Sequence, residues 1–402
     1  MFESTRRLST LECSESWRPY RATNFLSLMY PNIVFSKILG FFPYKCTPSE
    51  FVFSDTRFLL SAITQLVYIF LLASALYNAN INIEKSTVEV IDRNVFLISE
   101  GIMVLVMYGL SNQRYHLFKK LGKLSRMLSK QDFQNMAKFV HTKDIFGIIF
   151  LILHLPNCIV GLNETTLSCL TILYVLMVYL ALDMTYMNCV YVLRACFVKI
   201  NENLKQLNEH EEPCLATVSP HRGRSFLLLV KLKYCEELHQ ETSDVVQCLN
   251  KAFLFRIVIA AIITFTVITF NMYFAILGYG VTVWMKQRKS FWYFPHLEAV
   301  TFYLSKFAMM VIMCESAMKK AQEIGTTIHE ILSECTDETV KRELRMFALQ
   351  VLHRDNKFSA KAIAMDARLL TQIVGGIIMY ILILFQFLIN DAACRNVEHI
   401  DK

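Results

Sequence analysis

Seven apolar stretches divide the 402-residue chain, and each is long enough to cross a membrane. A helix needs about 20 mostly apolar residues to span the hydrocarbon core of a bilayer. Only 19% of the residues are charged, whereas a soluble globular protein has about a quarter. Together these features predict an all-α membrane protein with seven transmembrane helices. The predicted spans are residues 58–77, 93–111, 144–162, 168–190, 255–279, 297–316 and 369–390.

Lysine and arginine are unevenly distributed between the segments that connect these spans. With the N-terminus in the cytoplasm, the cytoplasmic segments hold 33 of the 41 Lys and Arg residues and the outer segments hold 7. Excess Lys and Arg marks the cytoplasmic side. The charge therefore predicts a cytoplasmic N-terminus and an extracellular C-terminus. The N-x-S/T sequon at Asn163 falls outside in this arrangement and is a glycosylation candidate.

This arrangement divides the chain into five parts. Residues 1–57 form a cytoplasmic N-terminal segment, residues 58–316 hold the first six spans, and residues 369–390 form the seventh. Residues 317–368 are rich in helix formers and are expected to form cytoplasmic helices, which we call the anchor region. Residues 391–402 form a short extracellular tail.

The anchor region contains one apolar stripe at helical spacing. Its members are Leu344, Phe347, Val351 and Leu352. Either ordinary packing beneath the membrane domain or contact with another subunit covers this stripe, and the sequence pattern leaves both possibilities open.

Several functional classes fit the sequence poorly. The basic residues form no tract, so no nucleic-acid partner is expected. The twelve cysteines have no metal-binding spacing, and no metal or cofactor is expected. No His/Cys/Asp cluster resembles a catalytic site, so the chain is not expected to be an enzyme. A transporter would show repeat symmetry between parts of the sequence, and the sequence shows none. A G-protein-coupled receptor would carry an acidic-Arg-aromatic triplet at the end of the third span and an Asn-Pro-x-x-Tyr motif near the end of the seventh, and the sequence has neither there. It would also have the opposite orientation in the membrane.

Polar side chains occur inside four of the predicted spans, at similar depth in the outer half of the membrane. Polar groups within spans are costly and tend to be functional, so we expect them to line a ligand pocket open to the outside. The alternatives are structural: Glu100 and Lys306 as a buried ion pair, and His154 capping a carbonyl released by Pro156. Asp183 is expected to lie at the inner interface. The pocket candidates are Glu100, His154, Asn157, Asn271, Tyr303 and Lys306.

The final fifty residues resemble the C-terminal signature of insect gustatory receptors. The signature ends in Thr-Tyr, five apolar residues and Gln-Phe, and Tyr380, Gln386 and Phe387 match it in "MYILILFQF". Upstream, the sequence "LQVLH" at 349–353, Phe358, Asp366 and the pair Leu369-Leu370 also match. Two positions depart from the pattern, since Met379 replaces the usual threonine and Ala362 replaces a common glycine. Over the rest of the chain the resemblance is architectural.

The resemblance implies a tetrameric ligand-gated cation channel in the plasma membrane of sensory neurons. The assembly would be a homotetramer or a heteromer with a co-receptor, embedded in membrane lipid and opened by a small-molecule tastant. The last helix would line the pore, and the inner helices would form the contact between subunits. An odorant receptor subunit of the same superfamily is the alternative.

In the last span, Ile383, Gln386, Phe387 and Asn390 fall on one helical face, with Tyr380 on the same helix. A ring of Gln386 amides would pass monovalent cations with little discrimination, and passage of divalent cations stays open. Ile383 and Phe387 would form a hydrophobic constriction. The alternative is that Gln386 donates a hydrogen bond to a neighbouring helix of its own subunit.

Overall fold

The computed structural model describes residues 18–46, 51–81, 87–160, 166–209, 221–285, 294–360 and 363–400. Side chains near several helix ends, including those of 156–160, 278–285 and 388–400, are not described. Asn163 lies outside the described residues, and the side chains of Asn157 and Asn390 are not described.

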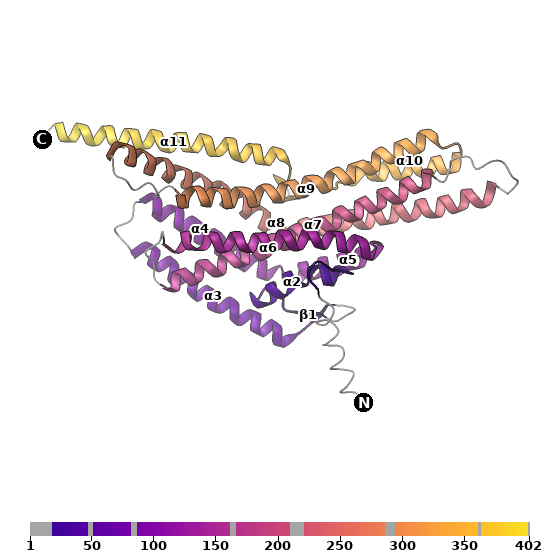
Figure 1. The fold of residues 1–402 in the computed structure, drawn as a ribbon, viewed down its shortest axis with the longest axis horizontal. Helices are drawn as coiled ribbons and strands as arrows, with labels where there is room; N and C mark the ends of the chain where they lie inside the picture. The colour runs from indigo at the N-terminus through magenta and orange to yellow at the C-terminus, as the bar shows by residue number, and fades with distance from the viewer. Residues whose placement is uncertain are drawn as a thin grey trace, which may run out of the picture.

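The described chain is almost entirely helical (Figure 1), and five of the seven predicted spans fall inside a helix. The predicted span 93–111 runs past a helix end at Gly109, and the predicted span 144–162 lies in a helix as far as Val160, beyond which the chain is not described. By length and apolar composition, five described helices are able to cross a membrane: α3, α7, α8, α9 and α11. A sixth span results if α4 and α5, which meet at 59°, are taken together. The helices that hold predicted spans are α3 (Asp55–Ile81), α4 (Thr87–Gly109), α6 (Lys130–Val160), α7 (Thr166–Glu209), α8 (His221–Met285), α9 (Phe294–Glu334) and α11 (Ala367–Ile400).

Helix α7 forms the centre of the membrane part. It packs against α8 and α9 along much of its length and also contacts α3 and α6. In its apolar window 67% of the residues are buried inside the chain, compared with 22% for α3 and 11% for α11. A helix that is apolar on every side requires apolar surroundings on every side. For α7 the protein provides them, whereas α3 and α11 leave most of their apolar surface uncovered by this chain.

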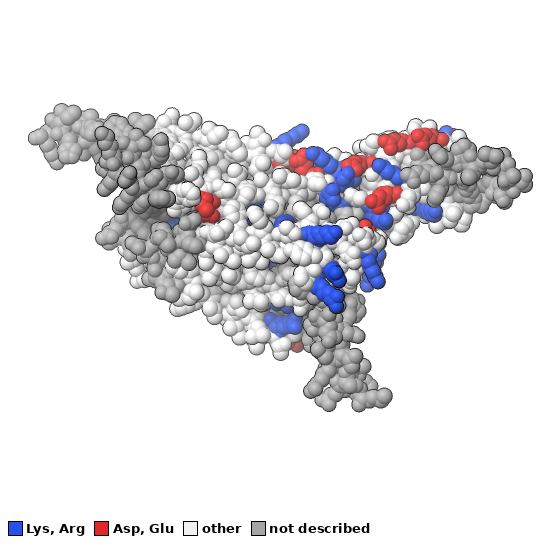
Figure 2. All heavy atoms as spheres, viewed as in Figure 1, with Lys and Arg blue, Asp and Glu red and all other residues white. Residues whose placement is uncertain are grey.

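The outer surface of α3 shows what the uncovered surface consists of. Phe58, Leu60, Leu66 and Phe70 are each exposed, although all are large and apolar. A soluble protein rarely exposes a contiguous apolar patch of this kind, and lipid is the solvent that suits it. In Figure 2 most of the coloured charges gather toward the end of the molecule that carries α5 (Ser111–Leu124) and α10 (Glu338–His353), and the described atoms to the left of them are mostly white.

Helices α7, α8 and α9 continue past their predicted spans and extend together toward α10 (Figure 1). Asp337 caps α10 by accepting hydrogen bonds from the backbone N–H groups of Thr339 at 2.8 Å and Val340 at 3.4 Å. After α10, a small hairpin of β3 (Ser359–Ala360) and β4 (Ile363–Ala364) leads into α11. Helix α11 continues to Ile400, through most of the residues assigned to the extracellular tail.

The described N-terminal part packs against the membrane helices. Helix α2 (Phe25–Ile38) is followed by Gly40, which has a φ of 75°, a left-handed conformation that favours glycine. Strands β1 (Tyr44–Cys46) and β2 (Phe51–Phe53) then pair in antiparallel register, with Tyr44 opposite Phe53. The short 3-10 helix η1 (Ser125–Met127) connects α5 to the region before α6.

Candidate functional site

A group of charged side chains is buried where α4, α7, α8 and α9 meet. Asp183 on α7 forms an ion pair with Arg256 on α8, and its other oxygen lies 3.3 Å from Lys306 Nζ on α9. The side chains of Arg256 and Asp183 are 0% and 3% exposed. The sequence predicts Asp183 near the inner membrane interface, and the structure shows that its side chain is buried by the surrounding helices. It lies inside the helix bundle, because Arg256 and Lys306 offset the cost of burying its charge.

Both cations of this group also contact aromatic rings. The Arg256 guanidinium lies 3.6 Å from the centroid of the Tyr179 ring, and Lys306 Nζ lies 3.1 Å from the same centroid. Lys306 Nζ is also 5.2 Å from the Phe302 centroid and 5.0 Å from that of Tyr303. Such cation–π contacts strengthen when the cation is desolvated. Lys306 is thus enclosed by three aromatic rings and one carboxylate.

Glu100 on α4 completes the charged group. Its side chain is buried, at 1% exposure. It lies close enough to Arg256 and Lys306 for both cations to act on its charge. The structural alternative, a direct pair of Glu100 with Lys306, is not what the structure shows, because Asp183 is the carboxylate at ion-pair distance from Lys306. The four ionisable groups are two acids and two bases, so their formal charges balance.

His154 on α6 connects this charged group to Glu298 on α9. Its ring stacks on Phe302 with centroids 4.4 Å apart and an interplanar angle of 8°, and it meets Tyr303 edge to face. His154 Nδ1 lies 2.7 Å from Glu298 Oε2. The structure therefore brings four of the pocket candidates into one connected cluster. We define the buried polar cluster as Glu100, His154, Tyr303 and Lys306 together with Asp183, Arg256, Tyr179, Phe302 and Glu298.

Asn271 on α8 lies in a separate contact. Its Oδ1 lies 2.9 Å from His296 Nδ1 and accepts a hydrogen bond from the tautomer that carries its proton there, and its Nδ2 donates to the Val267 carbonyl at 2.8 Å. The ring of His296 also packs on Phe274. Within the described residues, no hydrogen bond or ion pair joins Asn271 to the buried polar cluster, so the sequence-based grouping of Asn271 with Lys306 is not reproduced by direct contact.

The pore candidates lie on α11, which has the smallest buried share among the five candidate spans. Phe387 is 70% exposed and Ile383 is 36% exposed, and the Gln386 side chain is also exposed. Tyr380 is 48% exposed, but one side of its ring meets Phe265 on α8 edge to face at 5.4 Å. The exposed surface of α11 thus includes the amide of Gln386 among apolar side chains.

The anchor candidates divide into two groups. Leu344 and Phe347 are fully buried inside the chain. Val351 faces α9, since a Cβ placed on Gly325 would lie 3.6 Å from it. Ordinary packing within the chain therefore accounts for these three residues, and only Leu352, which is 79% exposed, is available to a partner. Met346 and Leu349 are exposed with it, so α10 has a second apolar face that we define by Met346, Leu349 and Leu352.

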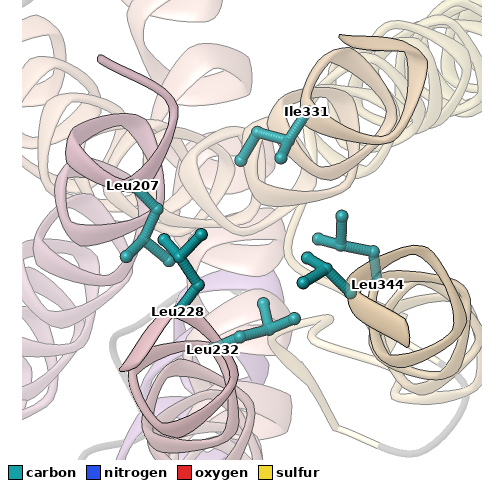
Figure 3. Close-up of a pocket in the computed structure, with 6 residues that line it drawn as sticks. Leu207, Leu228, Leu232, Ile331 and Leu344 are labelled. Carbon is teal, nitrogen blue, oxygen red and sulfur yellow. The ribbon is translucent and has the colours of Figure 1, made fainter. Parts of the chain in front are cut away.

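A small apolar cavity lies among the anchor helices (Figure 3). Aliphatic side chains from α7, α8, α9 and α10 point into it, and no titratable group is among them. Such a cavity fits packing between helices better than recognition of a polar ligand. Its lining residues are Leu207, Leu228, Leu232, Ile331, Val340 and Leu344.

The fold and the buried polar cluster are those of a helical, multi-pass membrane receptor. The family model described as 7tm chemosensory receptor matches residues 29–391, and the chain belongs to this family. A stretch covering 38% of the chain is 26% identical over 162 residues to the putative gustatory receptor 28b of Drosophila melanogaster. That stretch spans 33% of the relative's own length.

Solved structures of insect olfactory receptors share the fold. The olfactory receptor OR5 of Machilis hrabei matches with a TM-score of 0.64 and 10% identity, over 89% of this chain and 97% of that one. The same receptor in complex with eugenol matches with a TM-score of 0.62 and 10% identity, over the same shares of the two chains. The resemblance inferred from the C-terminal signature is confirmed, and the family is one of receptors rather than enzymes.

Several members of the buried polar cluster were not identified from the sequence as site residues. Arg256 stands at the edge of the predicted span 255–279, where a basic residue is ordinarily interfacial. Tyr179 and Phe302 are aromatic residues in apolar stretches, and such residues are usually core. The available signal was weak: Asp183 and Arg256 are acid and base near the inner ends of two spans, which allows them to pair if the helices are neighbours.

Proposed function

We propose that this chain is a chemosensory receptor that acts as a ligand-gated, non-selective cation channel, with four copies surrounding a central pore. Membership of the chemosensory receptor family and the olfactory receptor fold support this function. The similarity to a putative gustatory receptor favours a gustatory role, with a small tastant as ligand. The plasma membrane of sensory neurons is the location that suits this role.

The observation that carries the proposal is the exposure of α11. Only 11% of its apolar window is buried within the chain, and the side chain of Gln386 is exposed near its outer end. Lipid cannot satisfy an amide, because it offers neither donors nor acceptors in the hydrocarbon region. In a fourfold assembly the same surface would face the other copies and a water-filled axis. Ile383, Gln386, Phe387 and Asn390 would then contribute to the pore, with Tyr380 packed against α8.

We propose that the ligand binds at the buried polar cluster, against the aromatic rings around it. Binding sites for small molecules combine apolar walls with a few convergent polar groups, and His154, Tyr303, Lys306 and Glu100 meet this description. The solved complex of the Machilis hrabei receptor with eugenol supports a small-molecule ligand by analogy of fold. Asn157 and Asn271 remain candidates for the outer part of the same pocket.

We propose that the copies contact one another through the second apolar face of α10, defined by Met346, Leu349 and Leu352. This face is exposed in the single chain and lies in the part of the molecule where charged residues are common, so lipid is not its natural cover. Contact between copies would bury it. The distribution of Lys and Arg supports a cytoplasmic location for this region, with the N-terminus on the same side.

Expression of the chain in a cell line, with whole-cell recording, tests the proposed function. Application of sugars, bitter compounds and neutral aromatic compounds is expected to evoke a cation current while G-protein signalling is blocked. Abolition of the response by that block would overturn the channel and favour a G-protein-coupled receptor. An N-terminal tag is expected to be inaccessible to antibody in intact cells, and labelling there would overturn the orientation.

The second candidate is an odorant receptor subunit, which the fold match favours. Tyr380, Gln386 and Phe387 of the C-terminal signature argue for the gustatory branch. An odorant receptor subunit typically depends on a co-receptor, so the two candidates differ in one result. Ligand-evoked current from the chain expressed alone supports the gustatory assignment, and a strict requirement for an odorant co-receptor supports the other.

A further inference from the structure

The buried polar cluster contains more hydrogen-bond donors than the chain satisfies. Among the described residues, Arg256 Nε, Arg256 Nη1, Lys306 Nζ and the Tyr179 hydroxyl are buried without a hydrogen-bond partner. Lys306 Nζ meets Asp183 at ion-pair distance, but it is not aligned for a hydrogen bond. One carboxylate oxygen, Oε2 of Glu100, is buried without a partner as well. Buried polar groups in native proteins are almost always satisfied, and exceptions require an explanation.

The positions of these groups indicate the direction from which a ligand reaches them. Arg256 is 0% exposed and is already paired with Asp183, whereas the Lys306 side chain is 10% exposed. On its own helix, Lys306 lies one turn from Phe302 and Tyr303, and the ring of His154 stacks on Phe302. Lys306 Nζ is therefore the unsatisfied donor that lies beside these rings, on a side chain that is less enclosed than that of Arg256.

The charges of the cluster decide what kind of acceptor fits. At the centre of the cluster Glu100 and Asp183 formally balance Arg256 and Lys306, and Glu298 is paired with His154 at 2.7 Å, so no unpaired formal charge is left for a ligand to offset. An added anion or cation would bring an unbalanced charge into a desolvated site, which is costly. A neutral acceptor, such as a carbonyl oxygen, satisfies the donors without this cost. The rings of Phe302, Tyr303 and His154 favour a flat apolar body beside the acceptor, because aromatic groups stack on one another.

We propose that the buried polar cluster binds a neutral, planar ligand whose carbonyl-type oxygen accepts a hydrogen bond from Lys306 Nζ and whose apolar body lies against Phe302, Tyr303 and His154. This inference rests on the proposed function in that it names the ligand class of the same site. Tyr179 is the second donor within the cluster, and Arg256 holds Asp183 so that Lys306 is left available.

The test uses the detergent-solubilised full chain and the shift in its unfolding temperature with small aromatic probes. Acetophenone and coumarin carry a carbonyl oxygen, ethylbenzene lacks an acceptor, benzoate is an anion, and 1-phenylethylamine is a cation at neutral pH. The two carbonyl probes are expected to raise the unfolding temperature at least three times as much as the other three. Equal shifts with ethylbenzene, a larger shift with benzoate, or no shift with either carbonyl probe would overturn the proposal.

Lys306→Met tests the donor directly, since it keeps an unbranched apolar side chain and removes the ammonium. The carbonyl-dependent shift is expected to fall at least fourfold in this variant. Lys319→Met on the same helix is the matched control, because Lys319 is 67% exposed and pairs only with Glu315, and it is expected to keep the full shift. Retention of the shift in Lys306→Met would overturn the proposal. If that variant does not fold, Tyr179→Phe is tested instead. The carbonyl-dependent shift in unfolding temperature is expected to fall at least twofold in Tyr179→Phe, and an unchanged shift would contradict the proposed site.

Recordings from intact cells separate this inference from the proposed channel. Currents evoked by neutral aromatic compounds without any carbonyl preference would leave the channel standing and overturn the ligand class. A carbonyl-dependent thermal shift that requires Lys306, in a chain that passes no current with any probe, would support the site and overturn the channel.

Discussion

The ring of Phe265 on α8 meets the ring of Tyr380 on α11 edge to face, with the two centroids 5.4 Å apart. Further along the same two helices, Tyr273 meets Phe385 at 6.3 Å. Helix α8 also carries Arg256 of the buried polar cluster. Near the middle of α8, Asn250 donates to the Lys357 carbonyl at 2.7 Å and accepts from the Ser359 backbone N–H at 3.2 Å. One continuous helix therefore contacts the proposed ligand site, the proposed pore helix and the hairpin between α10 and α11.

Two adjacent glycines on α11 test the contact between α8 and α11. A Cβ on Gly376 would lie 3.0 Å from the Phe265 ring, so Gly376→Ala forces this ring to move, whereas a Cβ on Gly375 meets nothing within 4 Å. Alanine is favoured over glycine in a helix by about 1 kcal/mol. We expect Gly375→Ala to raise the unfolding temperature of the solubilised chain. Gly376→Ala is expected to raise it less or lower it, and to shift the ligand concentration for half-maximal current. Identical behaviour of the two variants would contradict the contact.

Gln386 and Phe387 test the pore. Phe387→Ala is expected to raise the current without ligand several-fold, because it removes a bulky apolar side chain from the proposed constriction. Gln386→Ala is expected to lower conductance, because it removes a polar lining group. Phe70→Ala on α3 is the control, since Phe70 is similarly exposed at 68% but lies on a surface assigned to lipid. Unchanged basal currents, conductances and reversal potentials in both α11 variants would remove these residues from the pore.

The second apolar face of α10 tests the assembly. Leu349→Glu with Leu352→Glu is expected to shift the solubilised protein from tetramer toward monomer in size-exclusion chromatography, while its helical content is kept. Phe347→Ala is expected to act differently, since this ring is fully buried and such truncations cost about 3–5 kcal/mol of folding stability. A tetramer that survives both glutamates would place the contact between subunits elsewhere.

Asp183 is expected to be among the most sensitive positions for stability. Asp183→Asn leaves Arg256 and Lys306 buried without a full counter-charge, and removal of one partner from a buried ion pair costs roughly 3–5 kcal/mol. Thermal unfolding of the solubilised chain measures the loss. Glu323→Gln is the control, because Glu323 pairs with Lys320 at the surface, where such pairs contribute about 0–1 kcal/mol. Similar unfolding temperatures for the two variants would show that the charge of Asp183 is not needed in the bundle.

His239 gives the anchor region a pH-dependent stability. It lies before the predicted span 255–279, is fully buried, and contacts Gln350 at 3.4 Å and Asn356 at 3.3 Å. Burial, and then the charge of Arg354, lower the pKa of His239 from 6.5 to about 4. The unfolded chain therefore binds the proton more readily than the folded chain. The stability from the neutral ring is fully present above pH 6.5 and is lost as the pH falls toward 4.

The expected loss over this window is roughly 3 kcal/mol, since each pKa unit corresponds to about 1.4 kcal/mol. Unfolding temperatures measured from pH 7.5 to 4.5 report it. In His239→Gln the decline toward low pH is expected to be shallower. His353→Gln, at an exposed position on α10, is expected to keep the decline of the unaltered chain. A decline that is the same with and without His239 would assign the pH dependence to other groups.

The positions of the helices were predictable because the signal for a membrane span is local. About 20 consecutive apolar residues specify a span whatever the rest of the chain does, and each of the seven predicted stretches lies wholly or mostly within an observed helix. The family was predictable for a related reason. Tyr380, Gln386 and Phe387 lie in one short motif, which can be read without knowing how the helices pack.

The sides of α10 show where periodicity alone reaches its limit. Leu344 and Phe347 repeat at helical spacing, and so do Met346, Leu349 and Leu352 on another side of the same helix. Only the packing of α10 on α8 and α9 decides which set is buried, because both sets are equally apolar. The predicted stripe mixed residues from the two sides.

The sequence by itself determined that this chain is a helical membrane receptor of the chemosensory family, since apolar length and a contiguous motif carry that information. Only the tertiary structure decided which charges meet. Asp183 and Arg256 are 73 residues apart in sequence, and Lys306 and Glu100 come from two further helices. Their arrangement depends on how four helices pack against one another. The physical reason is that a buried charge is stabilised by its neighbours in space, and no local pattern in the chain specifies those neighbours.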